Sequence, residues 1–245
     1  MKGIGSPWNS LDHAVHVWRE RLDCPEDERD RFQAWLSPDE KERAARFRFA
    51  RDRDAYIVAR GRLRQILSGY LDRMPTGIRF TYSPAGKPGL EPGPETADIQ
   101  FNLAHSRRRA VYAVTRNRRV GVDLEYRDLR AARTIADGFF APAEKAGYDR
   151  LPPEVRETAF FLWWTRKEAF LKALGGGLSI PLDQFEVSLA PGEPAALHGT
   201  GWDSAEAERW RLVDLEVERD YAGALAVEGR DWELIYRSGQ GEEKL

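Results

Sequence analysis

The segment of residues 154–174 constrains the fold of this chain more than any other. It predicts a long helix, and the three glycines that begin at Gly175 predict where that helix ends. Inside it, Glu168 and Lys172 stand four residues apart, so a helix places both side chains on one face. A pair at this spacing is most often a solvated ion pair, so it indicates a site only if further polar groups meet it.

A short strand is predicted upstream, at residues 121–125. Its period of two places Asp123 and Glu125 on one face and the apolar residues on the other. Such a pair is often only a polar strand edge. If this face meets Glu168 and Lys172, three carboxylates converge with one ammonium group, which suits a magnesium ion that handles phosphate groups.

Composition sets wider limits. The 245 residues, 42% of them hydrophobic, are enough for one large domain or for two fused small ones. A net charge of −2 argues against a general binder of polyanions. Because Cys24 is the only cysteine, neither an internal disulfide nor a thiolate cage for a metal is possible. The first residues lack an apolar signal core and no run is long enough to cross a bilayer, so we expect a cytoplasmic protein without a membrane partner.

The hydrophobic pattern and the turn residues predict a mixed chain of helices and strands. Ser37 is expected to cap a helix that starts at Pro38 and continues into a long helical region, with a break near residues 49–52. Residues 83–98, rich in Pro and Gly, are expected to form a loop. Strands are expected at residues 14–18, 78–82, 99–103, 110–115, 118–125, 183–189, 210–216, 222–227 and 232–236, and further helices at residues 130–140 and 143–150.

Four segments in a fixed order carry a family resemblance. They are residues 101–106 (FNLAHS), residues 121–125 (GVDLE), Phe139-Phe140 with Glu144, and residues 164–172 (WTRKEAFLK). The order resembles the 4′-phosphopantetheinyl transferases, specifically the larger, surfactin-synthetase type. That family shows Asn-hydrophobic-Ser-His-Ser, Gly-hydrophobic-Asp-hydrophobic-Glu and Trp-x-x-Lys-Glu-Ala-x-x-Lys in this order. By motif the likeness covers residues 35–190, and the chain length also fits this type.

The resemblance implies an α+β fold, a pseudo-dimer of two similar strand-helix-strands halves with the active site at the interface between them. On this basis residues 1–98 are expected to form the N-terminal half, which grips the nucleotide of coenzyme A. Residues 99–237 would form the C-terminal half with the metal and catalytic motifs, and residues 238–245 a polar tail. A fused pair satisfies its own interface, so we expect a monomer.

The resemblance also implies a reaction. A serine hydroxyl of an apo acyl or peptidyl carrier protein attacks the β-phosphorus of coenzyme A, the phosphopantetheine arm moves to the serine, and 3′,5′-ADP leaves. Catalysis of this kind is mostly positioning and electrostatics. The sequence does not indicate which carrier proteins are used.

Family positions assign roles to the converging side chains. Asp123, Glu125 and Glu168 match the metal ligands, and Mg²⁺ and Mn²⁺ both suit such oxygen ligands. Either a metal-bound water or Glu168 would take the serine proton. Lys172 would balance charge on the phosphates. Glu144 is an auxiliary catalytic candidate, with a solvated carboxylate in the first turn of a helix as the alternative.

Further positions resemble those that bind coenzyme A. His105 matches a histidine that contacts phosphate, although it follows Ala104 where the family usually has serine, which removes one hydroxyl donor. Arg51 is the first candidate and Arg43 the second for gripping the 3′-phosphate. The turn that contains Lys87 and Pro88 resembles one that approaches adenine and phosphate, and by itself it would be an ordinary exposed turn.

Two other functions remain open at this stage. Residues 41–64 and 107–119 are rich in arginine with interleaved aromatics, which would suit a nucleic-acid-binding module whose affinity falls steeply with salt. A catalytically inactive relative that only docks carrier proteins is the second alternative. The near-neutral total charge disfavours the first, and the complete set of site residues disfavours the second. We therefore expect no nucleic-acid partner.

Overall fold

The computed structural model describes residues 11–128, 140–177 and 180–238. The helices are α1 (Glu26–Trp35), α2 (Pro38–Ala45), α3 (Ala50–Leu71), α5 (Pro142–Arg150), α6 (Pro153–Leu174) and α7 (Glu206–Arg209). The strands are β1 (Ala14–Arg21), β2 (Phe80–Tyr82), β3 (Pro88–Leu90), β4 (Ile99–Ser106), β5 (Arg109–Arg116), β6 (Val120–Tyr126), β7 (Phe185–Val187), β8 (Leu197–Thr200), β9 (Trp210–Asp214), β10 (Tyr221–Glu228) and β11 (Glu233–Arg237).

Two sheets form the centre of the molecule. The first has the strand order β11-β1-β5-β4 and the second the order β6-β10-β9. All pairs are antiparallel except β1 with β11. Without β11, the two sheets pair their strands in the same way. Counted along the chain, the first strand of each sheet pairs with the third, and the third pairs with the second. Two short hairpins, β2–β3 and β7–β8, stand apart from the sheets.

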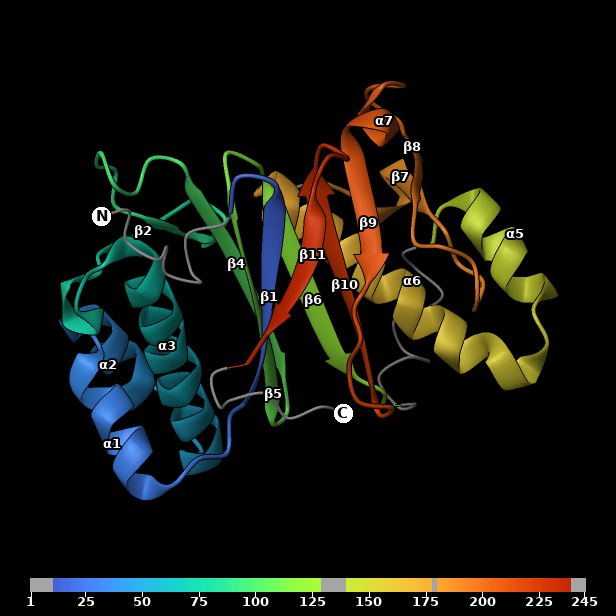
Figure 1. The fold of residues 1–245 in the computed structure, drawn as a ribbon. Coiled ribbons are helices and arrows are strands. Elements are labelled where there is room, and N and C mark those ends of the chain that lie inside the picture. Colours follow the sequence, from blue (N-terminus) through green and yellow to red (C-terminus); the bar gives the residue numbers. More distant parts are fainter. Residues whose placement is uncertain (1–10, 129–139, 178–179, 239–245) are drawn as a thin grey trace.

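The elements stack in layers, with α1–α3 on one side of the sheets and α6 on the other (Figure 1). One core lies between α1–α3 and the first sheet, a second between the two sheets, and a third beneath α6. In β6, Val122 and Leu124 join the core between the sheets. Gly121 lies against α6, where an added Cβ would come within 2.1 Å of the Ala169 carbonyl oxygen. The period of two thus turns Asp123 toward α6.

Local signals account for most element boundaries. Ser37 precedes α2, and its backbone N–H donates to a carboxylate oxygen of Glu40 at 3.0 Å. Helix α6 ends at Gly175, whose φ of 77° suits glycine. A break separates α2 from α3 at residues 46–49, slightly earlier than the break expected near residues 49–52. The expected helix at residues 130–140 lies outside the described residues, apart from its last position.

The basic segment that suggested nucleic-acid binding is partly buried. Arg60 and Arg64 both contact Glu40, with nitrogen–oxygen distances of 2.5 and 2.7 Å. Arg62 lies 3.3 Å from a carboxylate oxygen of Glu20. Because these charges are paired inside the protein, they are not available to neutralise phosphates at the surface.

The sheets do not follow the expected division after residue 98. Strands β4 and β5 come after that position, yet they pair with β1 in the first sheet. The chain passes from the first sheet to the second between Arg116 and Val120. Among the described helices, none is both long and apolar enough to cross a membrane.

Candidate active site

Asp123 is the centre of the candidate site. It lies on β6, is only 3% exposed, and its Oδ1 accepts a hydrogen bond of 2.6 Å from Lys172 Nζ. Its Oδ2 is buried and has no partner among the described residues. Burial raises the pKa of Asp123 above its usual value, and the Lys172 ammonium partly opposes this rise. The predicted meeting of the strand face with the helix face is therefore present for this pair.

Glu125 and Glu168 interact electrostatically with the same two residues, Asp123 and Lys172. Burial raises the pKa of both carboxyl groups, and the negative charge of Asp123 raises both further. Ser106 Oγ donates to Glu125 at 3.1 Å. As the side chains stand, the described residues contain no group of three or more His, Cys, Asp or Glu that would already hold a metal ion.

The donor set nevertheless fits a divalent cation with oxygen ligands. Three carboxyl groups lie in the field of one ammonium group, that of Lys172. The buried Oδ2 of Asp123 has a lone pair that no described group uses. Hard oxygen donors of this kind suit Mg²⁺ or Mn²⁺, which also keep several waters.

Two side chains of β4 that sequence reasoning missed hold the acidic strand in place. Asn102 Oδ1 accepts from the Val122 backbone N–H at 2.8 Å, and Ser106 Oγ accepts from Tyr126 N–H at 3.0 Å. They tie β4 of the first sheet to β6 of the second. The period-two alternation of β4 could have revealed them. It places both polar residues on the same face of the strand as Ala104, which is buried.

His105 and Ala104 occupy different environments. His105 is exposed at the surface, and its pKa is lowered by the partial loss of hydration and then by the charge of Lys172. The histidine is therefore close enough to Lys172 for the lysine charge to act on the imidazole. Ala104 is buried in the core between the sheets, so its methyl group packs where a serine hydroxyl would need a partner.

Lys87 and Pro88 lie at the β2–β3 hairpin. The Lys87 ammonium donates to the backbone carbonyls of Val120 and Lys172, at 2.9 and 2.6 Å. Burial lowers its pKa to about 8, and the charge of Arg119 adds to the effect. Pro88 begins β3 and is partly buried.

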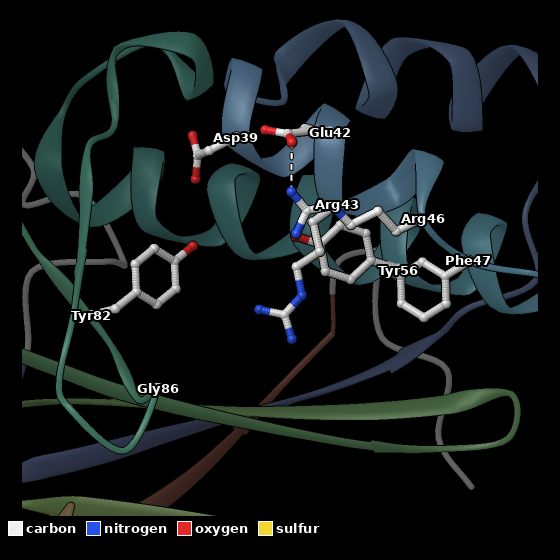
Figure 2. A pocket seen from close by; sticks show the side chains of 8 residues that line it. All are labelled: Asp39, Glu42, Arg43, Arg46, Phe47, Tyr56, Tyr82 and Gly86. Atoms are coloured by element: carbon white, nitrogen blue, oxygen red, sulfur yellow. Dashed lines mark hydrogen bonds and ion pairs between the residues drawn. The ribbon is translucent and has the colours of Figure 1, made fainter.

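A cavity of about 620 Å³ lies between α2, the start of α3 and this hairpin (Figure 2). Its lining residues are Asp39, Glu42, Arg43, Arg46, Phe47, Tyr56, Tyr82 and Gly86. Arg46 is paired with Glu42 at 2.5 Å. Arg43 lies over the Tyr56 ring, 5.6 Å from its centroid, and makes no ion pair within the described ranges. Arg51 is absent from the lining; its side chain is 87% exposed and contacts Asp52.

Glu144 is buried and fully bonded, which contradicts the alternative of a solvated carboxylate. Its oxygens accept from the backbone N–H groups of Ala141 and Val187, at 2.9 and 2.8 Å. Lys167, itself completely buried, forms an ion pair with Glu144 at 2.8 Å and donates to the Leu182 carbonyl. These contacts fasten α5 and β7 to α6, and the auxiliary catalytic role of Glu144 stays a prediction.

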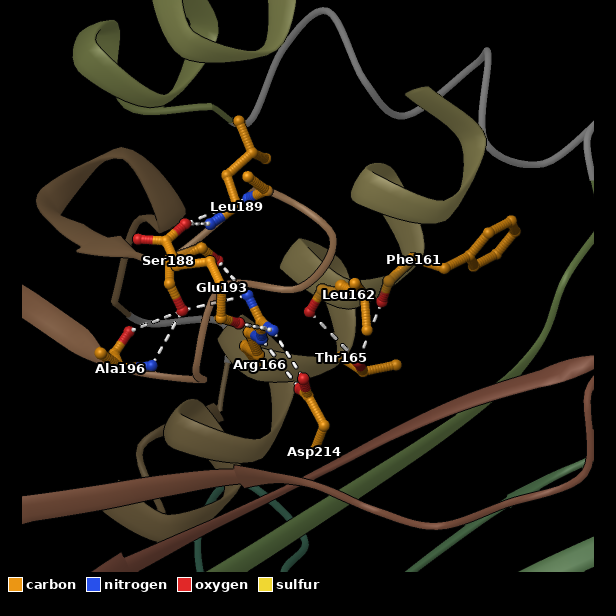
Figure 3. Close-up of polar contacts among 10 residues, drawn as sticks. Phe161, Leu162, Thr165, Arg166, Ser188, Leu189, Glu193, Ala196 and Asp214 are labelled. Carbon is orange, nitrogen blue, oxygen red and sulfur yellow. Dashed lines mark hydrogen bonds and ion pairs between the residues drawn. The ribbon is translucent and has the colours of Figure 1, made fainter. Parts of the chain in front are cut away.

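Arg166 anchors α6 on the side of the helix that faces away from Glu168 (Figure 3). Completely buried, it makes two bonds to the carboxylate of Asp214, at 2.8 and 2.6 Å. It also donates to the carbonyls of Ser188 and Glu193, at 2.7 and 3.1 Å. These bonds fix the rotation of the helix, and therefore the direction in which Glu168 points.

Known proteins match almost all of the chain. Residues 24–117 match the family described as 4′-phosphopantetheinyl transferase, N-terminal, and residues 119–226 match the 4′-phosphopantetheinyl transferase superfamily. The chain is 39% identical over 224 residues to the 4′-phosphopantetheinyl transferase HetI of Nostoc sp., which covers 91% of each protein. It is 30% identical over 164 residues to the 4′-phosphopantetheinyl transferase Sfp of Bacillus subtilis, covering 67% of this chain and 71% of Sfp.

A solved structure, the Chronobacterium ammoniagenes ACPS-CoA complex, covers 46% of this chain and 98% of its own, with a TM-score of 0.35 and 23% identity. The likeness to HetI extends over nearly the whole of both proteins, and the two family matches adjoin one another. This chain belongs to the 4′-phosphopantetheinyl transferase superfamily.

Proposed function

We propose that this phosphopantetheinyl transferase takes its group from coenzyme A and places it on a serine of an apo acyl or peptidyl carrier protein. The serine oxygen forms a bond to the β-phosphorus, the bond to the bridging oxygen breaks, and 3′,5′-ADP leaves with both electrons of that bond. One observation carries the proposal most strongly, namely the contact of Asp123 with Lys172 on the face that α6 shares with β6.

The carboxylates are proposed to hold a divalent cation. Asp123, Glu125 and Glu168 would be its ligands, and the unpartnered Oδ2 of Asp123 supports this assignment. When bound, Mg²⁺ or Mn²⁺ neutralises the pyrophosphate and orients it for attack. The ammonium of Lys172 now compensates Asp123, and it would be free to turn toward a phosphate once a cation takes over that charge.

The serine proton needs an acceptor near the carboxylates. Glu168 suits this task, because its raised pKa makes it a better base than an ordinary carboxylate while burial keeps water partly away. A water held by the carboxylates is the other candidate.

The cavity of Figure 2 is proposed as the nucleotide end of the coenzyme A site. Its volume suits a nucleotide, and it offers aromatic rings beside guanidinium groups. Arg43 is the leading candidate for the 3′-phosphate, since no described carboxylate neutralises it. The roles predicted for Arg51, Pro88 and His105 toward coenzyme A remain proposals.

We also propose that the chain is a fused pair of similar halves with the active site between them. The common strand order of the two sheets and the single long helix on each outer face support this. Asn102 and Ser106 reach from the first sheet to the acidic strand of the second. A fused pair would act as a monomer, and a soluble cytoplasmic location remains an expectation.

Intact-mass spectrometry tests the function directly. An apo carrier protein is incubated with coenzyme A, MgCl₂ and this protein, with an EDTA control and a MnCl₂ replacement. We expect a mass gain of one phosphopantetheine group, lost with EDTA, together with release of 3′,5′-ADP. No gain with acyl and peptidyl carriers alike would remove the proposal, and a gain that survives EDTA would remove its metal.

A further inference from the structure

The Lys87 side chain crosses from the β2–β3 hairpin to the elements that carry the candidate active site. Its ammonium group donates to the Lys172 carbonyl at 2.6 Å and to the Val120 carbonyl at 2.9 Å. Lys172 is the residue whose side chain contacts Asp123, and Val120 begins the strand that carries Asp123. The Lys87 side chain is therefore bonded to the backbone of both elements that form this ion pair, α6 and β6.

The turn from which Lys87 reaches is closed by three hydrogen bonds. In the turn of residues 83–87, Ser83 N–H donates to the Lys87 carbonyl at 2.9 Å and Gly86 N–H to the Ser83 carbonyl at 2.8 Å. Ser83 Oγ accepts from Lys87 N–H at 3.1 Å. Gly86 has a φ of 80°, which suits glycine, and it lines the cavity of Figure 2. The turn thus contributes Gly86 to the cavity lining and anchors Lys87 at the same time.

The receiving surface is shaped to admit this turn. A Cβ on Gly177, where φ is 58°, would stand 2.9 Å from the Ala85 Cβ, and one on Gly175 would stand 3.9 Å from the Lys87 Cδ. The missing side chain of Gly177 therefore makes room for Ala85, whereas the distance at Gly175 is an ordinary van der Waals contact. The Lys172 carbonyl lies in the last turn of α6, where carbonyls lose their intrahelical donors and a positive charge is favourable.

We propose that Lys87 is a positioning residue that locks the end of α6 against the start of β6, and so sets the reach of Lys172 to Asp123. This inference rests on the proposed function, because it assumes that Lys172 acts on the phosphates. It also separates Lys87 from the role suggested by family likeness, since its ammonium is bonded to two backbone carbonyls and Lys87 does not line the cavity proposed for the nucleotide.

Steady-state kinetics distinguish the two roles. In Lys87→Met most of the apolar stem is kept and both carbonyl bonds are lost, so we expect kcat to fall roughly tenfold while KM for coenzyme A stays within about twofold of wild type. Lys87→Arg, which can still donate to two carbonyls, should recover part of kcat. Lys145→Met is the matched control, because among the described residues Lys145 is a partly exposed lysine whose ion pair is with Asp149, and it should match wild type.

A double variant supplies an independent readout. If Lys87 acts through Lys172, adding Lys87→Met to Lys172→Met should slow the residual transfer by less than about twofold, since the residue to be positioned is already gone. Two outcomes overturn the proposal: a raised KM with unchanged kcat, as a direct phosphate contact would give, or wild-type values for both constants. If Lys87→Met does not fold in a thermal melt, the same two outcomes are judged on Lys87→Gln, whose shorter neutral side chain cannot donate to both carbonyls. Inactivity of the wild-type protein would instead remove the proposed function, before any variant is compared.

Discussion

At Asp123, one carboxylate oxygen holds an ammonium group while the other is buried without a described partner. A buried carboxylate in this state is costly, and this cost is the physical ground for proposing that Asp123 is a metal ligand. The sequence located this residue correctly on the strand face toward the long helix, because a period of two leaves no other orientation once the apolar residues enter the core.

Asp123→Asn keeps the shape of the side chain and removes its charge. We expect turnover to fall by about a thousandfold or more, because the proposed cation loses a ligand and Lys172 loses its counter-charge. The fold should persist, since burial already disfavours the charged form. Rates by intact mass and thermal melts measure the two effects, with Asp149→Asn on the surface as control. Turnover within tenfold of wild type at saturating Mg²⁺ would refute the assignment.

Arg43 and Arg51 allow a direct comparison at the nucleotide end. Arg43→Ala should raise KM for coenzyme A by about tenfold and leave kcat nearly unchanged, because the cavity loses its unpaired guanidinium. Sequence reasoning ranked Arg51 first, since a helix pattern shows which residues are basic but not which line a cavity. A larger KM effect for Arg51→Ala would restore that order.

Among the elements, α6 carries the site on one face and its anchor on another. The sequence predicted its limits well, since proline stands at its start and glycine at its end. It did not predict α1, whose ten residues are mostly charged and bury only Phe32. A helix with so weak an apolar pattern is decided by packing against α3 and not by its own sequence.

Arg166→Met tests the anchor of α6. The free energy of unfolding should fall by about 3 kcal/mol, because Asp214 and two carbonyls lose a buried donor while the apolar stem is kept. Urea denaturation measures the change, and the exposed Arg150→Met is the control. Activity should fall as well, because Glu168 would lose its fixed direction. A loss of stability below about 1 kcal/mol would show that the helix is held by its apolar core alone.

For the whole molecule, His16 links folding to pH. It is fully buried in β1, its Nδ1 lies 2.7 Å from the Tyr70 hydroxyl, and burial lowers its pKa to about 4, with a further contribution from Arg237. The folded value lies below the unfolded value near 6.5, so the unfolded chain binds more protons in that window. Stability therefore falls as the pH falls from 6.5 toward 4.

Between pH 7 and pH 5 this loss of stability is about 2 kcal/mol. The loss begins near the unfolded pKa of 6.5 and amounts to about 1.36 kcal/mol for each pH unit below it. His16→Gln removes the titration, so its loss of stability over that interval should be smaller than that of wild type by this amount. Urea denaturation at the two pH values gives both numbers. Exposed His13→Gln should behave as wild type, and equal pH slopes for wild type and His16→Gln would contradict the prediction.

The sequence by itself determined the α+β class, the long helix, the acidic strand and the family, because these depend on periodicity, terminating residues and motif order. Tertiary structure alone decided which side chains meet. It put Lys87 on the carbonyl of Lys172, enclosed Glu144 with Lys167, and placed Arg43 in a cavity that Arg51 does not reach. Contacts between residues 85 positions apart follow from how the layers stack, and no local pattern encodes that distance.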